Sequence, residues 1–217
     1  MNTEQEDKEL EQRMNEHREC EDRLGQLYEN LKVAQDFVWK RKLEDAERHF
    51  YAYCVKLAGA TTAAAIMNVD FSEFRSKIRE GVDKIIKEYT PQKAVDTRPV
   101  KAIYYEYDPD NEYDGSFFAC LDYAPVDNGD DEWACDWEDN FDGPAIPEYE
   151  DMKIDGLGIH YCFLKNDVSL GKYSYAVVRI YLEFAKACFE THCPIPICIG
   201  FHDQSDISRV FPDSLYE

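Results

Sequence analysis

The sequence has no long apolar run and only 10 glycines among its 217 residues. No stretch approaches the roughly 18 apolar residues that mark a membrane-spanning helix. The N-terminal segment lacks the basic and apolar regions of a secretory signal. No phosphate-binding glycine loop, dinucleotide-binding fingerprint, G-x-S-x-G elbow or HExxH helix is present. These absences predict a soluble, cytoplasmic protein that is not an enzyme and holds no cofactor.

The cysteine content gives no clear sign of a disulfide framework. A chain of this length without a secretory signal is expected to keep its cysteines as thiols, mostly buried as small hydrophobic side chains. The eight are Cys20, Cys54, Cys120, Cys135, Cys162, Cys188, Cys193 and Cys198. The last three, with His192 and His202, are alternative zinc ligands, but the four-residue gaps between these cysteines are wider than the usual zinc knuckle.

Basic residues are almost missing from one part of the chain. Residues 106–155 carry 18 acidic side chains and a single basic one, Lys153, whereas the net charge of the whole chain is −21. Such a segment repels itself and requires solvent, cations or a positively charged partner. It also disfavours nucleic acid, whose binding depends on Lys and Arg at the phosphates. The charge distribution therefore predicts a basic protein as the partner.

Aromatic residues are interleaved with these acids, whereas a solvating acidic tail contains few aromatics. Aromatic anchors surrounded by charge are typical of protein-binding hot spots. Some of the rings must serve the core, and the others are expected at the surface. The predicted partner-binding residues are Asp108, Asp110, Glu112, Tyr113, Asp114, Asp127, Asp130, Asp131, Glu132, Trp133, Asp136, Trp137, Glu138, Asp139 and Asp142.

Two metal-site interpretations of the acidic segment are weak. The loop from Asp110 to Gly115 resembles the start of an EF-hand, but its twelfth position is Leu121 instead of a bidentate Glu. The acids from Asp127 to Asp142 include no Lys, His or Arg of the kind that assists metal-dependent hydrolysis. An Asp-rich turn and an acidic interface account better for these residues, so no metal is predicted.

Helical periodicity dominates the first ninety residues. Apolar residues recur at three- and four-residue spacing from Leu10 to Val38, although Gly25 interrupts the series. A second series runs from Leu43 to Leu57 and stops at Gly59. A third, from Phe71 to Tyr89, follows a capping box formed by Asp70 and Glu73. These patterns predict two or three N-terminal helices.

The remainder of the chain changes to strand periodicity. Apolar runs at 100–107 and 117–123 predict a β-hairpin. A short strand or irregular stretch is expected at 133–137, and another apolar run lies at 159–164. A long helix is expected at 167–192, followed by a short strand at 195–201. The fold class is therefore α+β, with a mainly antiparallel sheet and a long C-terminal helix. Residues 1–92 are expected to form the helical region and 99–217 the α/β unit that contains the acidic segment 106–155, either as two units or as one integrated domain.

The acids and aromatics from Tyr104 to Asp142, and the helix and strand from Val177 to His202, resemble in style the immunity proteins with which bacteria neutralise polymorphic or contact-dependent toxins. The resemblance implies stoichiometric inhibition of a basic, nuclease-type toxin, and it transfers no individual residue. Alternatives are a nucleic-acid mimic that inhibits a defence or restriction enzyme, and a metal-binding protein or enzyme. The N-terminal helix is also a possible homodimer contact. No membrane partner is predicted.

Overall fold

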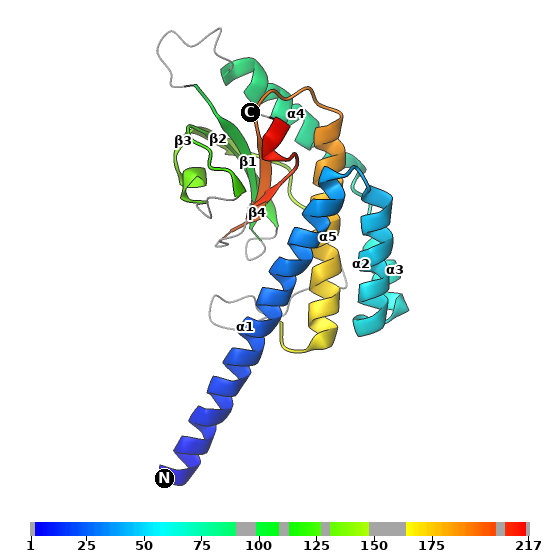
Figure 1. Cartoon of the computed structure of the whole chain (residues 1–217), viewed down its shortest axis with the longest axis vertical. Coiled ribbons are helices and arrows are strands. Elements are labelled where there is room, and N and C mark those ends of the chain that lie inside the picture. The colour runs from blue at the N-terminus through cyan, green and yellow to red at the C-terminus, as the bar shows by residue number, and fades with distance from the viewer. Residues whose placement is uncertain are drawn as a thin grey trace.

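The computed structural model describes residues 3–89, 99–108, 113–126, 131–147, 164–202 and 207–215, with side chains from residue 10 onward (Figure 1). Helices come first, and the sheet follows with one long helix inserted between its strands. The elements are α1 (Thr3–Trp39), α2 (Leu43–Ala58), α3 (Ala60–Met67), α4 (Ser72–Tyr89), β1 (Ala102–Asp108), β2 (Asp114–Cys120), the 3-10 helix η2 (Glu132–Cys135), β3 (Trp137–Asp142), α5 (Asp167–Phe189), β4 (Ile197–Phe201), β5 (Ser208–Arg209) and the 3-10 helix η4 (Asp213–Leu215).

Four helices precede the sheet, so the structure adds one to the two or three expected. The additional helix, α3, is the alanine-rich stretch directly after Gly59, which adopts a φ of 91° that glycine tolerates. Alanine has the highest helix propensity, and this explains why so short a segment is helical. The long helix α5 begins with a capping box in which Asn166 and Ser169 exchange hydrogen bonds.

The sheet is mixed, in the order β3-β2-β1-β4-β5. Strands β1 and β2, β2 and β3, and β4 and β5 pair antiparallel, and only β1 and β4 are parallel. The prediction of a mainly antiparallel sheet is therefore confirmed. Of the short strand or irregular stretch expected at 133–137, most is the 3-10 helix η2, and the strand β3 begins at Trp137. The run at 159–164 lies outside the described residues except for Leu164.

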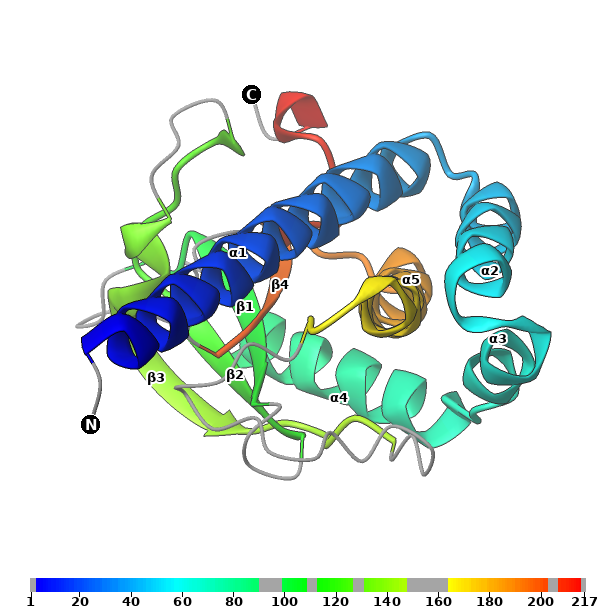
Figure 2. The same ribbon diagram turned by 90° about the horizontal axis from the view of Figure 1, so that it is seen from below.

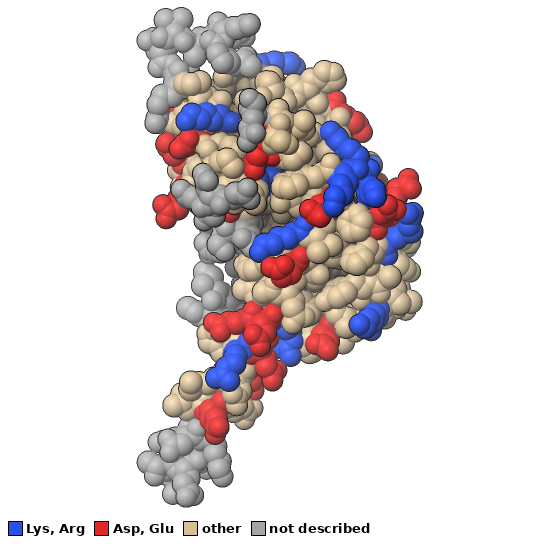
Figure 3. Space-filling view, in the orientation of Figure 1, with Lys and Arg blue, Asp and Glu red and all other residues tan. Residues whose placement is uncertain are grey.

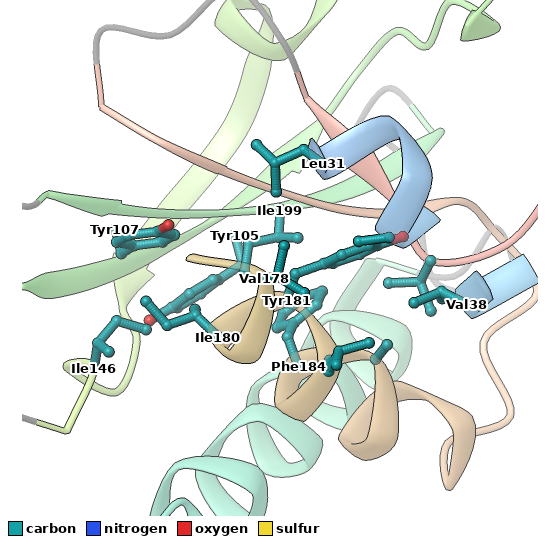
Figure 4. Close-up of a cluster of buried hydrophobic side chains, with 14 of the residues drawn as sticks. Leu31, Val38, Tyr105, Tyr107, Ile146, Val178, Ile180, Tyr181, Phe184 and Ile199 are labelled. Carbon is teal, nitrogen blue, oxygen red and sulfur yellow. The ribbon is translucent and has the colours of Figure 1, made fainter. Parts of the chain in front are cut away.

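Helix α5 is the centre of the molecule. Figure 2 shows it almost end-on, between the sheet on one side and α1, α2, α3 and α4 on the others. Fifteen of its residues are buried, and a helix that is apolar on most sides belongs in an interior. The ring of Phe184 stacks on that of Tyr105 from β1 with the centroids 5.4 Å apart. Side chains of α1, β1, β4 and α5 meet in this core (Figure 4).

One hydrophobic core joins the two regions expected from the sequence. It contains Leu31 and Phe50 from the first two helices, Phe74 from α4, Tyr105 from β1 and Phe184 from α5. Helix α2 packs mainly on α5, and α1 and α4 also contact it. The helical region therefore folds against the sheet and α5 as part of the same interior.

The cysteines follow the expected pattern with one correction. Cys54, Cys120, Cys188 and Cys198 are buried free thiols, and burial raises the pKa of Cys54 to about 11. Cys20, in contrast, is disulfide-bonded, so the prediction that all eight remain thiols is wrong at this position. The other described cysteines are free. Spacing in the sequence gives no information about which thiols meet in space.

Candidate functional site

The sheet has two faces of different character. One face packs on the helices through Tyr105, Phe117 and Ile199. The opposite face carries a small second cluster, in which Tyr104, Cys120 and Cys198 lie under Trp133 and Ala134 of η2. Helix η2 therefore covers one end of this second face, and the rows of side chains beyond it are more exposed.

Strand register brings acidic and aromatic side chains together on the exposed part of this face. Glu106 of β1 pairs with Ser116 of β2, which pairs with Asp142 of β3, so the three form one row across the sheet. The next row on this face, two residues along each strand, contains Tyr104, Phe118 and Asn140. Because side chains alternate between faces along each strand, both rows project from the same side. The open sheet face is defined here as Glu106, Ser116, Phe118, Trp137, Asn140 and Asp142.

Trp137 joins this face because of an irregularity in β3. The pairing shifts so that Asp139 lies opposite Ala119 and Trp137 lies opposite Cys120. A bulge of this kind inserts a residue and redirects the side chains beyond it. The ring of Trp137 consequently lies beside Phe118, with the centroids 5.8 Å apart, and its side chain is 42% exposed. An exposed tryptophan supported by a second ring is a large, rigid contact surface.

The carboxylate of Glu106 is held in place by two neighbours. The hydroxyl of Tyr104 donates to Oε2 at 3.2 Å, and Nδ1 of His202 lies 3.1 Å from Oε1. Burial, and next the Glu106 charge, raise the pKa of Tyr104 well above its usual value, so the hydroxyl stays a donor. A Cβ at Gly200 would lie 2.6 Å from the Tyr104 hydroxyl. Glycine at position 200 therefore leaves room for this arrangement.

The acids predicted from the sequence on and beside β3 are divided between the two faces of the sheet. Glu132, Asp136, Glu138, Asp139 and Asp142 are all exposed, but they do not all lie on the same face of the sheet. Asp139 points to the other side of the sheet, where it accepts a hydrogen bond from the Tyr89 hydroxyl of α4. Its Oδ1 also accepts from the backbone N–H of Asn140 at 2.9 Å. Carboxylates along β3, the last strand of the sheet in this order, oppose pairing with another strand.

Two other predicted residues have structural roles. Asp131 lies 2.9 Å from the guanidinium of Arg209, which is only 4% exposed, and it also accepts from the N–H of Ile207. Trp133 is 5% exposed and packs on Tyr123 with the centroids 5.1 Å apart. A buried cation requires a paired acid, so Asp131 stabilises the fold. Burial of Trp133 removes it from the surface on which a partner would bind.

The remaining predicted residues lie at the β1–β2 hairpin or outside the described residues. Asp108 and Asp114 face each other at the end of the two strands, and Tyr113 has a φ of 58° and packs partly on the core. Four of the predicted partner-binding residues lie outside the described residues: Asp110, Glu112, Asp127 and Asp130. Within the described ranges, no group of three His, Cys, Asp or Glu side chains is arranged to hold a metal ion.

Sequence reasoning missed three residues of this region: Glu106, Phe118 and His202. Glu106 is the only acid between Ala102 and Tyr107, and this isolated charge in an apolar strand was the available signal. The proximity of His202 had no local signal, since it depends on the parallel pairing of β1 with β4. The parallel partner of a strand is not set by local pattern, because a crossover separates the two.

Charge is distributed unevenly over the molecule. Lys and Arg side chains gather over the α1–α2 turn, whose sequence is Lys40-Arg41-Lys42 (Figure 3). Arg41 lies over the ring of Phe189, 3.4 Å from its centroid. The open sheet face, in contrast, includes two carboxylates and no Lys or Arg. In the part of the chain that is described, no helix has the length and apolar character needed to cross a membrane.

Comparison with known proteins identifies no relative. No family model matches the chain, and neither a curated protein nor a solved structure is similar to it. The function must therefore be argued from the site itself.

Proposed function

We propose that this protein binds a basic protein through the open sheet face and the exposed acids of β3, and that it neutralises this partner. The observation that carries the proposal is the position of Trp137. Its half-exposed ring lies against Phe118, on a face that also carries Glu106 and Asp142 and whose six defining residues include no Lys or Arg. This combination provides an aromatic surface for the stem of a Lys or Arg and carboxylates for its charge.

Each part of the surface has a distinct physical role in such a complex. The exposed acids Asp136, Glu138 and Asp142 attract a basic surface over a distance of about 10 Å at moderate salt, which speeds association. Trp137 and Phe118 bury apolar area on contact, which slows dissociation. Glu106 is already oriented by Tyr104 and His202, so less side-chain entropy is lost when a cation reaches it.

Neutralisation of a nuclease-type toxin is the form of this function that the resemblance to immunity proteins supports. A cleft that holds phosphates is basic, and an acidic face that covers it would exclude the substrate. The proposal includes a cytoplasmic location and requires neither a cofactor nor catalysis. A nucleic-acid mimic would use the same charge against a different partner, so the identity of the bound protein distinguishes the two.

The test uses variants at the open sheet face and matched controls elsewhere. Trp137→Ala and Asp142→Lys change side chains at the surface and should leave the protein folded. The control Met67→Ala removes an apolar side chain of similar exposure, 40% against 42%. The control Glu29→Lys makes the same charge change on α1, where Glu29 pairs with Lys32. Reversal at Asp131 is unsuitable because it would leave Arg209 unpaired in the interior.

Each variant is used to capture partners from lysate of the source cells, with washes at roughly 0.1 M and 0.5 M salt. The wild-type protein and both controls should retain one basic protein at the lower salt, and the two site variants should lose it. Adding the wild-type protein should then inhibit the activity of the captured partner. Equal capture by all five proteins would contradict the proposed site, and a captured restriction or defence enzyme would favour nucleic-acid mimicry.

A further inference from the structure

The two carboxylates of the open sheet face lie on either side of a short side chain. Glu106, Ser116 and Asp142 form one row across β1, β2 and β3, which are neighbours in the sheet (Figure 1). Paired strands are about 4.8 Å apart, so the backbones of Glu106 and Asp142 are separated by about 10 Å. The side chain of Glu106 is 26% exposed and Asp142 is exposed. We call these two residues the carboxylate pair.

Glu106 is oriented before any partner binds. Its Oε2 accepts a hydrogen bond from the Tyr104 hydroxyl, and its Oε1 lies 3.1 Å from Nδ1 of His202. A carboxylate offers about four lone-pair positions, so both oxygens can accept further donors. Gly200 of β4 pairs with Glu106 and adds no side chain to this row. The carboxylate of Glu106 is therefore held in place and can still accept a donor from solvent.

Aromatic rings lie directly beside the carboxylate pair. Phe118, two residues from Ser116 on the same face, lies between Tyr104 and Trp137. Its ring centroid is 5.9 Å from that of Tyr104 and 5.8 Å from that of Trp137. A cation beside such rings is attracted to their faces, and a planar guanidinium can also stack on them.

We propose that this arrangement binds an arginine side chain of the basic partner. The guanidinium lies between Glu106 and Asp142, above Ser116, and the aliphatic stem lies along Phe118 and Trp137. A guanidinium carries five N–H donors along its edges, so it can donate to carboxylates on two sides. An ammonium donates from a single nitrogen and contacts one member of so widely spaced a pair at a time. The open sheet face therefore selects arginine over lysine.

This inference rests on the proposed function, because it names the group that the open sheet face recognises on its partner. The two are nevertheless measured in different samples. Capture from lysate tests whether a basic protein binds, whereas arginine recognition is measured on the pure protein with short peptides. A captured partner without arginine recognition would leave the proposed function standing and refute this inference alone.

The probes are two capped tripeptides, Gly-Arg-Gly and Gly-Lys-Gly, titrated into the protein with nitrogen-labelled tryptophan. Nuclear magnetic resonance then observes the indole N–H signals of Trp39, Trp133 and Trp137, and the Trp137→Phe variant identifies the third. The arginine peptide should shift the Trp137 signal to saturation. Trp39 donates to the Arg209 carbonyl and Trp133 is buried, so their signals should stay in place and serve as internal controls.

Three variants locate the binding site. Glu106→Gln and Asp142→Asn should each weaken binding of the arginine peptide about fivefold, because each removes one charged contact. The lysine peptide should bind the wild-type protein about as weakly as the arginine peptide binds these variants. The control Glu29→Gln removes one negative charge on α1 and should leave the affinity unchanged. Unshifted Trp39 and Trp133 signals in each variant show that the fold is retained.

Three outcomes would overturn the proposal. The first is a Trp137 signal that the arginine peptide does not shift up to the solubility limit of the peptide. The second is equal affinity for the arginine and lysine peptides, since general attraction to negative charge would then account for the binding. The third is an affinity that Glu106→Gln and Asp142→Asn change no more than Glu29→Gln does, which would place the arginine elsewhere.

Discussion

Replacing Glu183 by Gln is expected to destabilise the protein strongly. This side chain of α5 is 1% exposed and contacts three cations: Arg75 of α4, Lys186 at 2.7 Å, and Arg179 at 3.6 Å. Arg179 in turn lies 2.9 Å from Glu47 of α2. The carboxylate therefore joins helices that are far apart in the sequence. Gln has nearly the same shape as Glu, and its amide oxygen still accepts hydrogen bonds, but it carries no charge. The substitution therefore isolates the electrostatic contribution.

The size of the effect follows from burial. Removing one partner of a buried ion pair typically costs about 3–5 kcal/mol, because the remaining charge is left unpaired away from water. Arg75 and Lys186 are about one-third exposed and regain some hydration, and Arg179, which is 11% exposed, keeps its contact with Glu47. We therefore expect the Glu183→Gln variant to lose about 3 kcal/mol, near the lower end of that range.

The pH dependence gives a second, independent signature. Burial would raise the pKa of Glu183, but the hydrogen bond and charge of Lys186, followed by the contacts with Arg75 and Arg179, lower it below the usual value. A lowered pKa in the folded state means that the unfolded chain binds the proton more tightly. The stabilisation by Glu183 is therefore complete above its unfolded pKa of about 4.3 and is lost as the pH falls below it toward the folded value.

Urea denaturation of the wild-type and Glu183→Gln proteins at neutral pH and at successively lower pH measures both effects. The difference in unfolding free energy should be largest at neutral pH and should decrease below about pH 4. Glu73→Gln is the control, because Glu73 forms a similar contact with Lys77 at the surface and should have little effect. A neutral-pH difference below about 1 kcal/mol, the usual value for a surface pair, would refute the reasoning.

Two further predictions concern packing and thiol exposure. Gly81→Ala should lower the unfolding free energy by about 1–3 kcal/mol, because the new Cβ would lie 2.3 Å from the Phe117 ring. Gly25→Ala in α1 should raise the unfolding free energy by roughly 0.5–1 kcal/mol, because its Cβ would meet nothing within 4 Å. Urea denaturation measures both changes, and two changes of the same sign would contradict this account. Cys135 is exposed and should react with a thiol reagent in the native protein. Cys120 is buried, and burial raises its pKa to about 12, so it should react only on unfolding. Mass spectrometry of the labelled peptides measures both rates, and equal rates in the native protein would disprove this.

Local pattern predicts the helices of this protein well. The periodic apolar positions of α1, α2, α4 and α5 are visible in the sequence because each helix buries one or more faces against the rest of the chain. The β1–β2 hairpin is likewise local, since its two strands are close in sequence and joined by turn residues. Helix α3 was missed because its residues are nearly all small and apolar, which leaves no contrast between a buried and an exposed face.

The candidate site depends on contacts that no local pattern encodes. Counting residues is enough to find the acidic segment and its aromatics. It does not show that Trp137 and Asp142 lie on the open sheet face while Asp131, Trp133 and Asp139 do not. Asp131 became structural because Arg209, from the end of the chain, is buried beside it. Trp137 reached the open sheet face through a change of register in β3, which reverses the face on which side chains lie.

The amino-acid sequence is therefore sufficient to determine the fold class, the main helices and the excess of acid in one segment, because periodicity and composition are properties of neighbouring residues. Only the tertiary structure decided which of those acids and aromatics are exposed together. Exposure is set by the packing of segments such as β1, β4 and the chain around Arg209, which are separated by up to about a hundred residues. Glu106 and His202 meet only because β1, which precedes α5 in the sequence, pairs in parallel with β4, which follows α5.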